Sequence, residues 1–141
     1  MIGWRVWRID PRYRLFSVLR DELWVPGHPL VAACESGHAA PERSCACGVY
    51  AVQSPDLAAQ YLVGRNSPEA VHRVLGLVAL WGWVVEGAQG WRAEHAYPVR
   101  LWVPDCSVSF EIAFELGRYG VPVDLVAARR PADVVGAALA G

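Results

Sequence analysis

The stretch that decides the fold is residues 74–97, VLGLVALWGWVVEGAQGWRAEHAY. Residues 74–86 are apolar on both alternating faces, which is typical of a strand covered on two sides of a sheet. The next four residues, GAQG, have the composition of a hairpin turn, and WRAEHAY reads as the returning strand. Pro98 is expected to interrupt that strand, with a further strand over 100–103. The sequence thus predicts a central β hairpin region over residues 74–103.

Alternation and turn residues elsewhere predict further elements. Strands are expected over 4–9, 13–19, 48–52 and 121–126, and helices over 54–63, 107–119 and 131–140. Ser54 and Pro55 form a good helix start, Asp105 is expected to cap the second helix, and Gly120 to stop it. The sequence therefore predicts the α+β class: a mainly antiparallel sheet or partly open barrel, with two or three helices and a metal-stabilised loop.

The composition is that of one folded domain spanning residues 1–141. Apolar residues make up 54% of the chain and charged residues 19%, which is enough for one hydrophobic core. The formal net charge of −1 gives no global electrostatic attraction to nucleic acid or to an acidic membrane surface. The opening residues lack the pattern of a signal peptide, and no stretch stays apolar long enough to span a bilayer. We expect a cytoplasmic protein without a membrane partner.

The chemistry of the chain is concentrated in residues 34–47, CESGHAAPERSCAC. Within fourteen residues this run holds four donors that suit zinc, namely Cys34, His38, Cys45 and Cys47. The run has no apolar periodicity, so it would be a loose loop unless something other than a hydrophobic face held it. We interpret it as a zinc-binding loop whose structure depends on the metal.

Three other interpretations of the cysteines stay open. The thiols can be ordinary free cysteines without a ligand. Cys45 and Cys47 can form a redox pair, because an exposed thiolate of low pKa is a nucleophile. An iron–sulfur cluster uses the same donor types. Cys106 stands apart from the others, and we place it in the first turn of a helix without assigning it a role.

The hairpin carries a second group of candidate residues, which could bind a ligand: Trp81, Trp83, Trp91, Arg92, Glu94, His95 and Tyr97. On a strand, Arg92 and Glu94 share one face and His95 points to the other. An arginine beside a carboxylate can orient an anionic ligand, and tryptophans can stack on bases or cationic groups. The simpler alternative is a cross-strand ion pair on a solvated face, with most of the tryptophans in the core.

Three patterns in the chain can be written CxxxHxAPxxxCxCGxYA, VxLWGxV and GWRAExAYP, and they begin at Cys34, Val78 and Gly90. Together they resemble a group of small, uncharacterised actinobacterial proteins over roughly residues 3–125. The resemblance implies that the cysteine cluster and the hairpin form one site. It implies no activity, because none is established for that group.

These observations favour a small intracellular zinc-binding module with a binding or regulatory role and no catalysis, its partner a protein or a small molecule. The common motifs of nucleotide-binding proteins, metalloproteases and hydrolases are missing from the sequence. One alternative is a thiol-redox protein or small enzyme that uses Cys45 or Cys47, with His38 or His95 as a base. Another is single-stranded nucleic-acid binding through the N-terminal arginines and exposed tryptophans. The arginines in question are Arg5, Arg8, Arg12, Arg14 and Arg20.

Overall fold

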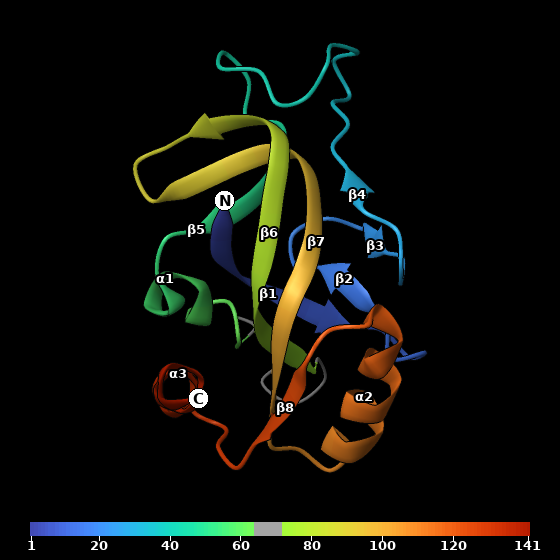
Figure 1. Ribbon diagram of the computed structural model, residues 1–141, viewed down its shortest axis with the longest axis vertical. Helices are drawn as coiled ribbons and strands as arrows, with labels where there is room; N and C mark the ends of the chain where they lie inside the picture. The colour runs from blue at the N-terminus through green and yellow to red at the C-terminus, as the bar shows by residue number, and fades with distance from the viewer. Residues whose placement is uncertain (64–71) are drawn as a thin grey trace.

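The computed structural model describes residues 1–63 and 72–141, and it shows one curled, mostly antiparallel sheet flanked by helices (Figure 1). The strands are β1 (Ile2–Ile9), β2 (Leu15–Ser17), β3 (Leu23–Trp24), β4 (Leu30–Val31), β5 (Val49–Val52), β6 (Arg73–Glu86), β7 (Gly90–Pro104) and β8 (Val123–Val126). The helices are α1 (Pro55–Ala59), α2 (Ser109–Leu116) and α3 (Pro131–Ala140), with a 3-10 turn, η1 (Gly117–Tyr119), after α2. The predicted α+β class with a mainly antiparallel sheet is confirmed.

The hairpin of β6 and β7 is the centre of the sheet. β6 pairs with β1 and β7, and β7 also pairs with β4, β5 and β8. Successive residues of β6 are buried on opposite faces: Val74 packs in a cluster with Ile112 of α2, and Leu75 in a cluster with Val134 of α3. In Figure 1, α2 lies to one side of the hairpin and α1 and α3 to the other. The prediction of a strand covered on both faces therefore holds for residues 74–80, whereas residues 81–83 are exposed.

The expected interruption at Pro98 is wrong, because β7 runs unbroken from Gly90 to Pro104. Pro98 pairs with Val78, while the next pair towards the end of the strand joins Arg100 to Leu77. One residue of β7 is thus left over between the two pairs, which is a β-bulge. A bulge tolerates a residue without an N–H group, so the strand bends here instead of ending.

The ends of several elements differ from the predicted ones. α1 ends at Ala59 and does not reach residue 63, although Ser54 does cap it by accepting the N–H of Leu57 (3.3 Å). β2 covers only three of the seven residues expected for it. β8 is shorter than expected and runs parallel to β7, which makes the sheet mixed.

Asp105 is not the cap of α2, as we had expected. The residue before the helix is Val108, whose side chain makes no cap, and the carboxylate of Asp105 instead accepts a hydrogen bond from Arg129 (3.2 Å). Gly120 does end the helical segment, in a left-handed conformation (φ 72°) that glycine adopts without strain.

The described part of the chain, residues 1–63 and 72–141, contains no helix with the length and apolar character that crossing a membrane requires.

Candidate metal centre

The segment with the cysteines connects β4 to β5 and stands at the end of the molecule where the hairpin bends (Figure 1). Two backbone turns shape it: the N–H of Gly37 donates to the carbonyl of Cys34 (3.0 Å), and the N–H of Cys45 donates to that of Glu42 (3.1 Å). Gly37 takes a positive φ of 85°, which favours glycine at this position. The turns fold the two halves of the loop towards each other.

The side chains of Cys34, His38, Cys45 and Cys47 converge. Their four donor atoms all lie within 4.8 Å of one another. The Sγ of Cys34 is 3.4 Å from the Nε2 of His38 and 3.7 Å from the Sγ of Cys45. Metal bonds of about 2.3 Å to sulfur and 2.0 Å to nitrogen give tetrahedral edges of about 3.5 and 3.8 Å for these two pairs. The arrangement can therefore hold a metal ion.

The imidazole of His38 is oriented by its second nitrogen. Its Nδ1 lies 3.0 Å from the carbonyl oxygen of Ala39 and 3.2 Å from a carboxylate oxygen of Glu42. Both oxygens are hydrogen-bond acceptors, so Nδ1 carries the hydrogen and Nε2 presents its lone pair towards the thiols. The Ala39 carbonyl, with Cys34 and Glu42, raises the pKa of His38. Such an outer carboxylate is typical of histidines that bind metals.

The three thiols differ in their surroundings. Hydrogen bonding from the backbone N–H of Cys47 and contact with the thiol of Cys34 lower the pKa of Cys45. Cys47 is only 4% exposed, and its burial raises its pKa. Cys34 and Cys45 are free thiols, since their sulfurs are much further apart than the roughly 2.05 Å of a disulfide.

Arg92 of β7 ties the loop to the sheet. Its Nη1 donates to the carbonyl oxygens of Glu42 (2.9 Å) and Cys47 (2.8 Å), and its Nη2 donates to that of Arg43 (3.4 Å). A guanidinium has several N–H groups in one plane, so it can bind several carbonyls at once. Its positive charge also lies next to a segment that would carry three thiolates around a metal.

We expect Arg92→Met to weaken metal binding by about tenfold, because carbonyls of Glu42 and Cys47 lose a charged donor. Metal affinity measured by competition with a chromophoric chelator tests this. Arg92→Lys keeps the charge but not the planar guanidinium. Its metal affinity should therefore lie between those of the original protein and Arg92→Met. Unchanged affinity in Arg92→Met would show that the loop holds its geometry without this contact.

Glu94 and His95 lie at a second bulge in the hairpin. Gly82 and Trp83 of β6 stand opposite the single residue Glu94, and Gly82 has a positive φ of 77°. The carboxylate of Glu94 accepts the N–H of Trp83 (3.0 Å), and its other oxygen lies 3.6 Å from His95. Trp81 stacks on His95 with ring centroids 5.7 Å apart. The bulge leaves Trp81 40% and Trp83 63% exposed on the surface.

Two other candidates from the hairpin have structural contacts. The hydroxyl of Tyr97 donates to the carbonyl of Tyr119 (2.7 Å) and accepts the N–H of Gly27 (2.8 Å), which joins three segments. Trp91 is partly buried against the core. The structure therefore brings Arg92 to the metal loop, leaves Trp81 and Trp83 exposed beside His95, and packs Trp91 and Tyr97 into the body of the protein.

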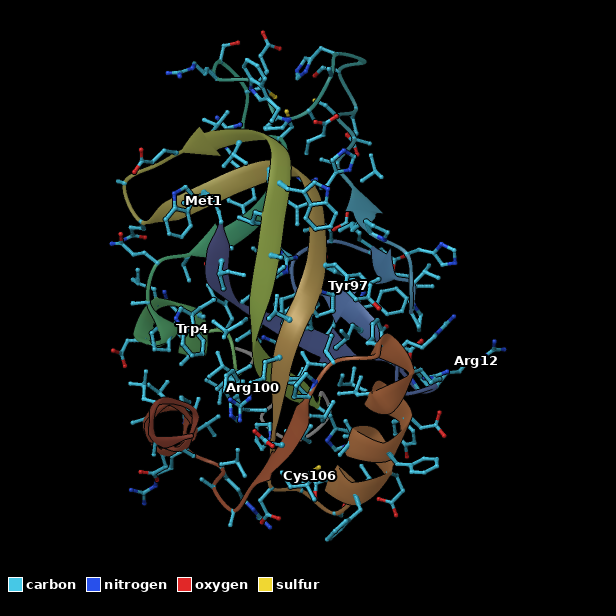
Figure 2. All side chains as sticks on the ribbon, viewed as in Figure 1. Met1, Trp4, Arg12, Tyr97, Arg100 and Cys106 are labelled. Atoms are coloured by element: carbon cyan, nitrogen blue, oxygen red, sulfur yellow. The ribbon has the colours of Figure 1, made fainter. Side chains whose placement is uncertain are left out.

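Cys106 lies far from the cluster, at the opposite end of the molecule from the loop (Figure 2). The prediction that it is in the first turn of a helix is wrong, because it precedes α2, which begins at Ser109. Most of the N-terminal arginines are engaged by neighbours within the protein. Arg8 pairs with Asp21, and Arg14 with Asp10. Arg12 projects from the surface in Figure 2.

Sequence reasoning did not find the supporting residues Glu42 and Tyr50. Glu42 follows His38 by four residues, a spacing that a turn-rich loop does not translate into contact by itself. The hydroxyl of Tyr50 donates to the carbonyl of Ala46, between two of the cysteines, and this contact depends on how β5 leaves the loop.

The fold and the site together define an α+β protein with a Cys3His group in which the donor atoms are close enough to hold one metal ion. Comparison of the chain with protein-family models, curated proteins and solved structures found no match.

Proposed function

We propose that this protein is a small cytoplasmic zinc-binding module with a binding or regulatory role. The observation that carries the proposal is the convergence of four donor atoms within 4.8 Å in a loop with little to bury. Free thiols at this spacing suit a reducing compartment such as the cytoplasm. The zinc orders the loop and performs no chemistry.

The donor set favours one zinc ion. Three thiolates and an imidazole are a common ligand set of structural zinc, and four protein ligands leave no position open for a substrate. In an iron–sulfur cluster with several irons, the cysteines bind different metal atoms, so the donor atoms have to be further apart than around a single ion. A single iron would fit the same tetrahedron, so metal analysis has to distinguish the two metals.

The surface beside the loop supports binding in preference to catalysis. Trp83 is 63% exposed at the bulge of the hairpin, and Trp81 is exposed beside it. Exposed tryptophans are typical of surfaces that contact a protein or a small molecule. In this role the metal keeps the loop in the shape that a partner recognises.

Metal analysis of the purified protein tests the proposal. We expect about one equivalent of zinc per chain, and a cobalt-substituted protein with the intense absorption of tetrahedral thiolate coordination. Cys47→Ser should lose the metal, whereas Cys106→Ser should keep it. Less than half an equivalent of zinc, or iron in its place, would contradict the proposal.

A thiol-redox protein is the second candidate, because Cys45 has a lowered pKa and its sulfur is 3.7 Å from that of Cys34. Thiolates bound to zinc resist alkylation until the metal is removed, whereas a redox thiolate reacts at once. Mass spectrometry after iodoacetamide treatment, with and without chelator, separates the two. Rapid labelling of Cys45 without chelator would favour the redox protein.

A further inference from the structure

A cleft of about 460 Å³ lies on the side of the sheet that faces α1. Its volume is in the range of about 300–1,000 Å³ in which proteins bind small molecules. Most of the wall is apolar and comes from β1, the turn after β2, β5 and α1. The apolar lining includes Trp4, Val18, Leu19, Val52, Ala58 and Tyr61. Figure 2 shows Trp4 on the side of the molecule where α1 lies.

Three charged side chains, Arg5, Arg20 and Glu22, line the cleft beside its apolar residues, and Arg5 of β1 is the one held by contacts to the surrounding strands. Its Nη1 donates to the carbonyl of Tyr50 (2.6 Å), and its Nη2 donates to the hydroxyl of Ser17 (2.9 Å). Its carbon Cζ lies 4.9 Å from the centre of the Trp24 ring, which fixes the guanidinium by a cation–π contact. The head group is therefore preorganised, and each terminal nitrogen uses one of its two N–H groups in these bonds.

The charge of Arg5 is poorly compensated. Among residues 1–63 and 72–141, Arg5 forms no ion pair with a carboxylate. The nearby carboxylate of Glu22 accepts a hydrogen bond from Ser17 (2.7 Å), so it reaches Arg5 only through that hydroxyl. Arg20 adds a second cation to the lining. Burial lowers the pKa of Arg5 to about 10, as expected of a cation that lacks a direct counter-ion.

We propose that the cleft binds a small amphipathic carboxylate, with the carboxylate on Arg5 and the hydrocarbon body against Trp4, Val52 and Ala58. A guanidinium that is fixed in place and partly desolvated binds a carboxylate far better than a neutral group. The apolar walls favour a hydrocarbon chain, whose burial adds to the affinity. The hydrogen bonds that hold Arg5 involve none of the four metal donors.

The metal loop contributes part of the lining of the cleft. Ala46 and Gly48 line the cleft, and Ala46 stands between Cys45 and Cys47. The hydroxyl of Tyr50, itself part of the lining, holds the carbonyl of Ala46. A change in the loop would therefore alter the mouth of the cleft, so the two sites are expected to be coupled.

Isothermal titration calorimetry of the purified protein, residues 1–141, with decanoate tests the proposal. We expect saturable binding of one decanoate per chain. Octanoate should bind more than tenfold more weakly, since each buried methylene contributes about fourfold in affinity. Decanol and decylammonium should each bind at least tenfold more weakly than decanoate. Equal or tighter binding of decylammonium, or no binding of decanoate, would overturn the proposal.

Arg5→Gln should lower decanoate affinity at least tenfold, and Arg5→Lys should lower it less. Arg12→Gln is the matched control, because Arg12 is an exposed arginine outside the cleft, and it should bind as the original protein does. If near-ultraviolet circular dichroism shows that Arg5→Gln is not folded, the affinities of the original protein for decanoate and decylammonium still test whether the cleft prefers a carboxylate. Unchanged affinity in a folded Arg5→Gln protein would overturn the assignment of the carboxylate to Arg5.

Discussion

Removing the metal with a chelator is expected to lower the Tm of the protein by about 12 °C. A ligand that binds only the folded state at a thousand times its Kd stabilises that state by about 4 kcal/mol. In a domain of this size, each kcal/mol corresponds to about 3 °C. The cluster holds together the two halves of a loop that buries few side chains, so nothing else replaces the metal.

The loss of order should be confined to the loop. The two core clusters of the sheet contain none of the four donors, so the sheet is expected to survive. Hydrogen exchange should show lost protection in residues 34–48, with β6 and β7 still protected. Differential scanning calorimetry with and without chelator gives the Tm values.

The control for chelation is Cys106→Ser, because Cys106 lies at the end of the molecule away from the loop. This variant should show the same fall in Tm on chelation as the original protein. Cys34→Ser should have a low Tm with or without chelator. A Tm that chelator leaves unchanged in the original protein would mean that the four donors hold no metal that contributes to stability.

Gly90→Ala is expected to destabilise the protein by about 3 kcal/mol, because overpacking against backbone cannot be relieved by rotating a side chain. Gly90 starts β7 and pairs with Val52 of β5. A Cβ at this position would lie 2.1 Å from the carbonyl oxygen of Ala51 and 2.7 Å from the Cα of Val52. The strand β5 would therefore have to move away from β7.

Gly87→Ala is the matched control in the same turn. There the nearest atom to an added Cβ is the carbonyl oxygen of Gly90 at 3.6 Å, an ordinary contact. We expect its free energy of unfolding in urea to stay within about 0.5 kcal/mol of the original. If Gly90→Ala and Gly87→Ala have the same free energy of unfolding, β5 and β7 do not approach each other as closely at Gly90 as the structure shows.

The two predictions meet at β5. This strand follows the metal loop directly, and Tyr50 in its middle contacts both Arg5 and the carbonyl of Ala46. Displacing β5 by Gly90→Ala should therefore weaken metal binding as well as stability, and the chelator competition described for Arg92 measures it. A destabilised variant with unchanged metal affinity would show that the loop is independent of β5.

Features that depend on residues close together in the chain were predictable from the sequence alone. Residues 74–80 are largely buried, as their apolar pattern predicts, and α3 spans residues 131–140 as expected. The four donors of the loop were recognisable because they lie within fourteen residues of each other. A turn-rich segment that short can bring them together without help from distant parts of the chain.

Tertiary structure decided what depends on residues far apart in sequence. Proline alone predicted a break at Pro98, but pairing with Val78 and a bulge keep β7 continuous. The sequence predicted Arg92 as a ligand-binding residue. In the structure it instead donates to the carbonyl of Glu42, fifty positions away in the chain. Arg5 reads as one arginine of a basic strand, and only its contacts with Ser17 and Tyr50 place it in a cleft. The local sequence pattern determines which face of a strand a side chain occupies. The packing of strands that are distant in sequence determines which residues that side chain contacts.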